Sequence, residues 1–234
     1  RVLRADSPRA LSPRLPMHIY RLVACTATLA LSAAAHAVVI NQIDDFQDGT
    51  TQGWSIGLPP DPVNVETGGP LGTGDRFLRL TADGSSNGGR LTTFNQAQWR
   101  GDYIAAGVDA IEMDLRNFAT QTLSIRIAFK QSASPGTPGF SSTVAFSLPA
   151  DGQWHHAVFP INTMSMTRLG STTLDLNTLL QNPIEMRILH STSPSLSGNN
   201  IVAQLGIDNI RAIPSPGAAL LPLGAMLGAV RRRR

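Results

Sequence analysis

Apolar and polar residues alternate in short stretches along the whole middle of this chain. The alternation is strictest in 111–116, 123–130 and 184–188, where every second residue is Ile, Leu, Met or Phe. Successive side chains of a β-strand point to opposite faces of its sheet, so this pattern predicts strands with one apolar and one polar face. Gly, Pro, Asn, Asp and Ser gather between the stretches, as is typical of the turns that join strands.

The pattern predicts about ten strands and very little helix. The predicted strands are 38–46, 53–57, 76–81, 90–94, 108–117, 123–131, 143–148, 154–161, 184–190 and 201–212. A short helix is expected in 174–180 and a single helical turn within 95–106. Because no helices alternate with the strands, we expect an all-β fold, a two-sheet antiparallel sandwich of the jelly-roll kind, filling 38–212.

The first 37 residues have a different character. Residues 1–16 are rich in Arg, Pro and Ser, and we expect them to be an upstream extension of a natural protein that starts at Met17. Residues 17–37 have the parts of a signal peptide, namely a basic start, an apolar helical stretch, and a small-x-small cleavage site at Ala35 and Ala37. We expect signal peptidase to cut after Ala37 and the rest of the chain to be exported.

An alternative for this segment is lipidation of Cys25, because Leu22 to Cys25 matches a lipoprotein box. Such a box ends an apolar stretch, whereas only 17–21 precede it here. Cys25 is therefore better explained as a small apolar residue inside the signal helix.

The last segment, 213–234, combines a Pro-x-Pro motif, an apolar run at 217–230 and a block of arginines. The run is shorter than the roughly 20 residues of a stable membrane span. Its proline and glycines also make it a poor helix. We expect a short hydrophobic helix that anchors the chain transiently in the inner membrane, with the arginines on the cytoplasmic side. A plain hydrophobic helix with snorkelling arginines is the alternative.

This layout resembles the PEP-CTERM sorting signal of Gram-negative bacteria. The usual start of that signal is Val-Pro-Glu-Pro, whereas this chain has Ile213-Pro214-Ser215-Pro216. The resemblance implies processing by an exosortase and release to the cell surface or extracellular matrix. The residues that would be read are Pro214, Pro216, Arg231, Arg232, Arg233 and Arg234.

Without the two end segments the chain is acidic. Residues 38–212 hold 10 basic and 15 acidic residues, so the basic pI of 9.7 belongs to the ends, and we expect no nucleic-acid partner. They contain no cysteine, so the domain must be held together by its core and any bound metal. About 175 residues suffice for one independently folding domain.

Short motifs follow one another along the predicted domain. They are Asp45-Phe46, Gly53-Trp54, Trp99 to Tyr103, Asp151 to Trp154, and Gly206 to Ile210. In this order they resemble the laminin-G-like and carbohydrate-binding-module jelly rolls of exported bacterial proteins. The resemblance implies a module that associates with sugars or with the extracellular matrix, without indicating a particular ligand.

Acidic residues lie near the start and near the end of the predicted domain. Asp45 and Asp48 come from the first strand and the turn after it, and Asp208 from the last strand. The first and last strands of a jelly roll run side by side, and calcium takes six to eight oxygen ligands. The resemblance implies a structural Ca²⁺ ion on these three residues. The alternative is that Asp48 belongs to a turn and Asp208 caps a loop.

The polar faces of the three strictest strands carry charged side chains. If these strands share a sheet, their outer face offers carboxylates and guanidinium groups to a polysaccharide. The candidate ligand-binding residues are Trp99, Tyr103, Glu112, Asp114, Arg126, Glu185 and Arg187. The alternative is a solvated face with cross-strand ion pairs that contribute well under ~1 kcal/mol each.

Residues 112–117 are similar to the Glu-x-Asp-x-x-Glu motif of jelly-roll glycosidases, but Asn117 replaces the final glutamate. Retaining hydrolysis needs a second carboxyl group about 5–5.5 Å from the first. His155 and His156 are adjacent on a strand and point to opposite faces, so they cannot chelate one metal. We therefore expect a non-enzymatic protein of the cell surface or matrix that associates with extracellular polysaccharide. The alternatives are a purely structural surface protein and, more remotely, a glycoside hydrolase.

Overall fold

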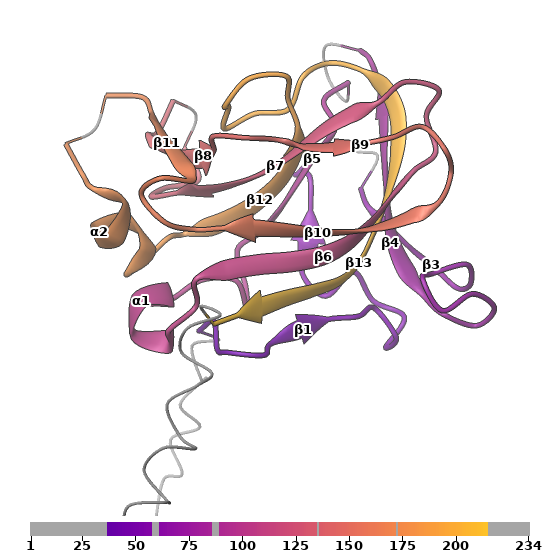
Figure 1. Ribbon diagram of the computed structural model, residues 1–234, viewed down its shortest axis with the longest axis horizontal. Helices are drawn as coiled ribbons and strands as arrows, with labels where there is room; N and C mark the ends of the chain where they lie inside the picture. The colour runs from indigo at the N-terminus through magenta and orange to yellow at the C-terminus, as the bar shows by residue number, and fades with distance from the viewer. Residues whose placement is uncertain (1–36, 58–60, 86–88, 135, 172, 215–234) are drawn as a thin grey trace, which may run out of the picture. The chain divides into compact units, whose positions relative to one another are not determined.

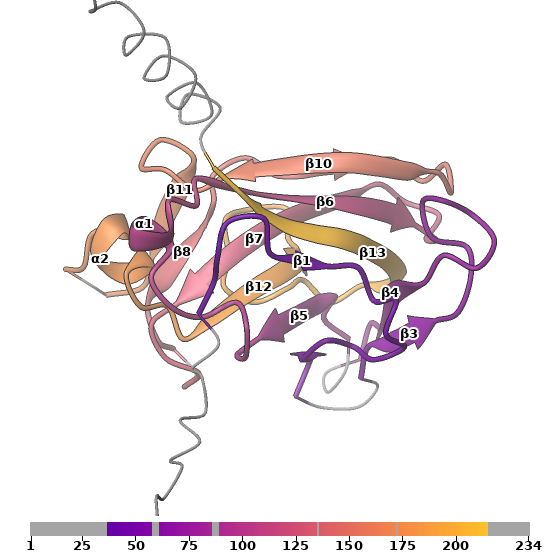
Figure 2. The same cartoon turned by 90° about the horizontal axis from the view of Figure 1, so that it is seen from below.

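The computed structural model describes residues 37–57, 61–85, 89–134, 136–171 and 173–214. Within these ranges the chain forms thirteen strands and two short helices. The strands build two antiparallel sheets that pack face to face, and both helices lie at one end of the sandwich (Figures 1 and 2). The expected all-β, two-sheet jelly-roll sandwich is confirmed.

The first sheet contains both the opening and the closing strand. Its order is β10 (Trp154–Pro160), β6 (Ala110–Asn117), β13 (Val202–Ile213), β4 (Phe77–Asp83) and β3 (Val63–Val65), and β1 (Ile43–Asp44) also pairs with β13. The pairing of β1 with β13 places Asp44 opposite Ile210. The expectation that the first and last strands run side by side is thus confirmed.

In the second sheet, β5, β7 and β12 lie close to their predicted positions, and the remaining strands have two to four residues each. Its order is β11 (Met166–Leu169), β8 (Gly139–Ser142), β7 (Leu123–Lys130), β12 (Glu185–His190), β5 (Thr92–Asn95) and β2 (Trp54–Ser55), and β9 (Phe146–Leu148) also pairs with β7. The sequence pattern missed β3, β8 and β11. Each has only three or four residues, which is too short for alternation to stand out.

The helices begin at aspartates, as local chemistry favours. Asp102 accepts a hydrogen bond from the Ala105 amide at 2.8 Å and starts α1 (Tyr103–Ala106). Gly107 ends this helix in the left-handed conformation with a φ of 69°. Asp175 starts α2 (Leu176–Leu180) in the same way, accepting from the Thr178 amide at 2.7 Å.

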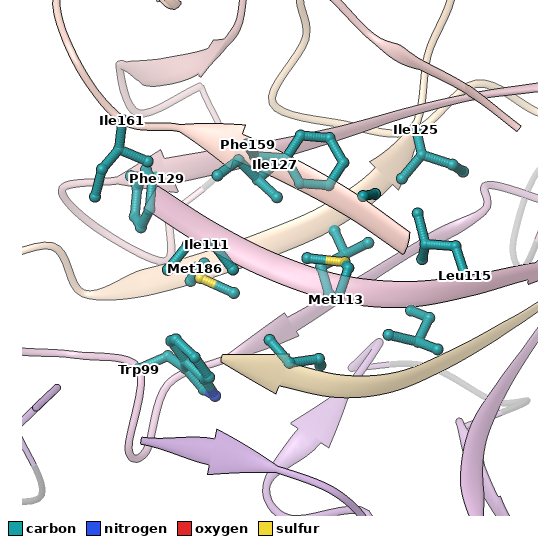
Figure 3. Close-up of a cluster of buried hydrophobic side chains, with 14 of the residues drawn as sticks. Trp99, Ile111, Met113, Leu115, Ile125, Ile127, Phe129, Phe159, Ile161 and Met186 are labelled. Atoms are coloured by element: carbon teal, nitrogen blue, oxygen red, sulfur yellow. The ribbon is translucent and has the colours of Figure 1, made fainter. Parts of the chain in front are cut away.

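The core lies between the two sheets, on the inward faces that the alternation predicts. Figure 3 shows side chains from β6, β7, β10 and β12 meeting there. The labelled residues are Trp99, Ile111, Met113, Leu115, Ile125, Ile127, Phe129, Phe159, Ile161 and Met186, all of them buried. Each Å² of apolar surface that leaves water stabilises the fold by about 25 cal/mol, and this burial is the main force that holds the two sheets together.

One carboxylate connects the two sheets through this core. Asp44 of β1 is buried, and its Oδ2 accepts hydrogen bonds from the indole nitrogens of Trp54 at 2.7 Å and Trp99 at 2.6 Å. Gln98 donates to the same carboxylate at 3.1 Å. Burial raises the pKa of Asp44, although the hydrogen bonds from Trp99, Trp54 and Gln98 oppose that rise. Because Trp54 belongs to β2, the bond from Asp44 crosses from the first sheet to the second.

Some of the sequence-based expectations lie outside the described residues. These are the upstream extension, most of the signal peptide with Ala35, and the tail from Ser215 onward with Pro216 and the four arginines. Ala37 and Pro214 are described, and they lie at the two ends of the sandwich domain's chain. No helix within the described ranges has the length and apolar character needed to cross a membrane.

We predict that Asp44→Asn destabilises the protein by about 2 kcal/mol, because a neutral amide oxygen is a weaker acceptor for the two buried indole donors and the new NH2 group would face the donor of Gln98. Chemical denaturation measures the free energy of unfolding. Asp61→Asn is the matched control, because Asp61 is exposed. Equal stabilities of the two variants would contradict the role given to Asp44.

Candidate functional site

The charged candidate residues lie on two faces that point in opposite directions. Glu112 and Asp114 belong to β6 in the first sheet, whereas Arg126, Glu185 and Arg187 belong to β7 and β12 in the second. Both sheets turn their apolar faces inward, so their polar faces point away from each other. The expectation of a single charged face is corrected accordingly.

The two aromatic candidates are inside the core. Trp99 and Tyr103 are fully buried, with no exposed side-chain surface. The Trp99 indole donates to Asp44, and the Tyr103 hydroxyl donates to the Trp99 carbonyl oxygen at 2.9 Å. Neither ring offers a face to a ligand, so the ligand-binding role expected of these two residues is corrected to a structural role.

A groove of about 740 Å³ lies on the outer face of the second sheet. Its floor comes from β5, β7 and β12, and its walls come from residues 133, 136 and 137, from the loop 191–200 and from the end of β11. The lining residues are Arg90, Thr92, Lys130, Ala133, Gly136, Thr137, Leu169, Gly170, Arg187, Pro194, Ser195, Leu196 and Ser197. We call this hollow the sheet groove.

An ion network underlies the floor of the sheet groove. The Glu185 carboxylate is buried, and it accepts from Arg187 Nε at 2.6 Å and lies 3.4 Å from Lys130 Nζ. Gln96 donates to its second oxygen at 2.8 Å. Burial acts to raise the pKa of Glu185, but the hydrogen bonds from Gln96 and Arg187 and the two positive charges lower it overall. Two cations therefore share one anion, which leaves the floor with positive charge.

Arg187 also connects the floor to a wall. Its Nη1 donates to the Leu196 carbonyl oxygen at 2.7 Å, which holds the loop 191–200 over the sheet. Its guanidinium lies 5.5 Å from the centre of the Phe94 ring, within the range of a cation–π contact. The half-buried Phe94 ring is thus in contact with a side chain of the protein.

Arg126 lies on the same outer face but is committed to the fold. Its guanidinium donates to the carbonyl oxygens of Ser142, Thr143, Ser191 and Thr192 at 2.6 to 3.3 Å. The side chain is buried, and burial lowers its pKa. Arg126 therefore holds two loops against β7 and has no access to a ligand.

Arg90 and Lys130 line the sheet groove, although neither was a candidate from the sequence. Lys130 could have been found, because it lies on the polar face of the same alternating stretch as Arg126. Arg90 gives no such signal, because its place depends on a single bridge that pairs it with Asn200. The Arg90 guanidinium is exposed and has no hydrogen bond or ion pair with any residue that the structure describes.

The candidate carboxylates of the first sheet are paired with neighbours instead. His156 lies 3.1 Å from Asp114 and 3.6 Å from Glu112, from the strand beside them. Arg211 lies 3.7 Å from the second oxygen of Glu112, and Asn209 donates to Asp114 at 2.9 Å. This is the arrangement of the alternative interpretation, a polar face with cross-strand pairs.

The candidate calcium ligands have different surroundings. Asp48 accepts from the amide and hydroxyl of Thr50 and so closes its own turn. Asp208 is fully buried at a β-bulge in β13, and its Oδ2 has no hydrogen-bond partner in the described structure. No group of three or more His, Cys, Asp or Glu residues within the described ranges is placed to hold a metal, so calcium at Asp45, Asp48 and Asp208 stays a prediction.

A second hollow, of about 610 Å³, lies at the edge between β9 and β10. Its lining is mostly apolar and includes the exposed side chains of Val144, Val158 and Met164. It offers few hydrogen-bonding groups, which makes it a poorer match to a sugar than the sheet groove.

The chain matches no protein-family description, and no curated protein matches it. Solved structures do share its fold. An exo-β-agarase matches with a TM-score of 0.52 at 12% identity, over 75% of this chain and 25% of the agarase chain. The match therefore concerns one part of that larger enzyme, and at this identity it shows the fold alone.

Carbohydrate-binding modules are also among the structural neighbours. A family 11 module from Clostridium thermocellum, solved with a β-1,3-1,4-mixed-linked tetrasaccharide, has a TM-score of 0.48 at 18% identity, over 76% of this chain and 97% of the module. A family 28 module specific for non-crystalline cellulose has a TM-score of 0.44 at 16% identity, over 76% of this chain and 97% of the module.

The burial of Asp208 predicts a dependence of stability on pH. Burial raises the pKa of Asp208 to about 8, and the charges of Asp75, Asp114 and Asp45 add to that rise. The folded state then keeps a proton that the unfolded state has released, so the contribution of Asp208 to stability is greatest at low pH and is lost as the pH rises through about 8. In chelator, the free energy of unfolding should decrease by roughly 1 kcal/mol per pH unit between about pH 5 and about pH 8.

Asp208→Asn has no such proton to lose, so urea titrations of this variant should show a flatter pH profile than the wild type. Superimposable profiles of the two proteins would count against a protonated Asp208.

The calcium prediction is tested by thermal unfolding. If calcium binds at Asp208, calcium at about 100 times its dissociation constant should stabilise the protein by about 2.7 kcal/mol, and chelator should reverse the gain. Asp208→Asn should lose the response, whereas Asp61→Asn, a change at an exposed aspartate outside the predicted site, should keep it. A melting temperature that is the same in calcium and in chelator would eliminate this site.

Proposed function

We propose that this protein is an exported, non-enzymatic module that binds an extracellular polysaccharide in the sheet groove. The observation that carries the proposal is the groove itself, an open hollow of about 740 Å³ with convergent polar groups. Its volume lies in the range of about 300–1,000 Å³ that is usual for ligand sites.

The chemistry of the lining supports a sugar as the ligand. Thr137, Ser195 and Ser197 bring hydroxyl groups to the groove. Those of Thr137 and Ser195 already donate to the carbonyl oxygens of Ser134 and Ser197, and each keeps an acceptor lone pair for a sugar hydroxyl. The Arg187 guanidinium is planar and adds donors in a fixed geometry. Sugar hydroxyl groups need such closely spaced donors and acceptors.

A binding role fits the site better than hydrolysis does. Glycoside hydrolysis generally uses two carboxyl groups, one on each side of the scissile bond. Among the described lining residues of the sheet groove none is acidic, and Glu185 beneath them is held by Lys130 and Arg187. Glu112 and Asp114 lie on the other sheet, with His156 between them.

Export and sorting are part of the same proposal. The patterns of 17–37 and 213–234 support cleavage by signal peptidase and processing by an exosortase-type enzyme, with the inner membrane as a transient anchor. The cell surface or matrix is where an extracellular polysaccharide would be met.

The proposal predicts that blocking the sheet groove abolishes polysaccharide binding. Ala133→Trp would place an indole in the groove from an exposed wall position, and we expect it to weaken binding at least tenfold in affinity electrophoresis of the full-length chain. Ala150→Trp makes the same change at an exposed alanine outside the groove and should bind like the wild type. If the wild type were retained by no polysaccharide, the protein would be a structural component without a glycan ligand.

A further inference from the structure

We propose that the sheet groove selects an anionic polysaccharide, whose carboxylate or sulfate groups are held by Arg90 and Arg187. This inference rests on the proposed function and names the class of glycan. It follows from the charge of the groove, from the donors left free on its arginines, and from the lack of an aromatic surface among its described lining residues.

The sheet groove is positively charged in an otherwise acidic domain. Arg90, Lys130 and Arg187 line it, and among the described lining residues there is no Asp or Glu to balance them. Even with Glu185 counted, the cations are in excess, whereas residues 38–212 as a whole carry 15 acidic and 10 basic residues. Positive charge is therefore concentrated at this site, and low-dielectric walls strengthen its effect on an anion.

The two arginines have donors available for an anion. Arg90 is exposed and has no partner within the described ranges, so its guanidinium is free to form a paired contact with a carboxylate or sulfate. The hydrogen bonds of Arg187 to Glu185 and Leu196 use only part of its five N–H groups. Lys130 donates to the Ser134 carbonyl oxygen and lies against Glu185, so it adds positive charge to the groove but makes little direct contact with a ligand.

A neutral glycan would find little to stack on in this groove. No Trp, Tyr or Phe is among its described lining residues. Phe94 of β5 is half-buried, is not among the lining residues, and has the Arg187 guanidinium 5.5 Å from its ring centre. Trp54, Trp99 and Tyr103 are buried in the core, where their polar atoms serve the fold. Charge pairing is thus the strongest interaction that the groove can offer.

The test is affinity electrophoresis of the full-length chain in gels that contain one polysaccharide each. Polygalacturonate supplies carboxylates, a sulfated galactan supplies sulfate esters, and agarose and a mixed-linked β-glucan serve as uncharged glycans. The two anionic gels distinguish a uronate from a sulfate ligand. We expect retention in at least one of them, and a loss of at least tenfold in affinity when the salt rises from about 0.02 M to about 0.5 M.

Two arginine variants separate a specific site from general attraction. Arg90→Gln should weaken anionic binding about tenfold, because it removes the free guanidinium of the groove. Arg100→Gln removes the same charge from an exposed residue outside the groove and should change affinity less than twofold. Equal losses in both variants would overturn the proposal, as would equal retention of the wild type by duplex DNA.

The two proposals fail in different ways. Salt-insensitive binding to an uncharged glycan that Ala133→Trp blocks would overturn the anionic ligand and leave the polysaccharide-binding function intact. Retention in none of the gels would overturn both.

Discussion

The fold depends on a carboxylate buried where the two sheets meet. Asp44 comes from a strand of the first sheet, and Trp54, one of its indole donors, comes from a strand of the second. A buried charge is costly unless hydrogen bonds replace its water, and here two indoles and one amide do so. In a domain whose described residues include no cysteine, this polar connection fixes how the opening segment docks against the core.

The two faces of the second sheet differ in character. Its inner face packs against the core, where Trp54 donates to Asp44, whereas its outer face carries charges and hydroxyl groups. Arg126 and Arg187 then hold the loops above that face by bonding to their carbonyl oxygens. The loop 191–200, which both arginines contact, forms one wall of the sheet groove.

Local alternation was enough to predict most of the fold. The inward sets of β6, β7 and β12 are the apolar positions of 111–116, 123–130 and 184–188, because side-chain direction along a strand is a property of neighbouring residues. The pairing of β1 with β13 followed from the jelly-roll expectation. The short strands β3, β8 and β11 escaped, since three or four positions rarely display a period.

The sequence by itself determined an all-β sandwich and the face on which each side chain of a long strand lies. Only the tertiary structure decided which strands share a sheet, and so it separated Glu112 and Asp114 from Glu185 and Arg187. It also buried Trp99 and placed Arg90 and Lys130 along the same groove. The physical reason is that alternation is set by adjacent residues, whereas strand partners are set by contacts between segments far apart in the chain.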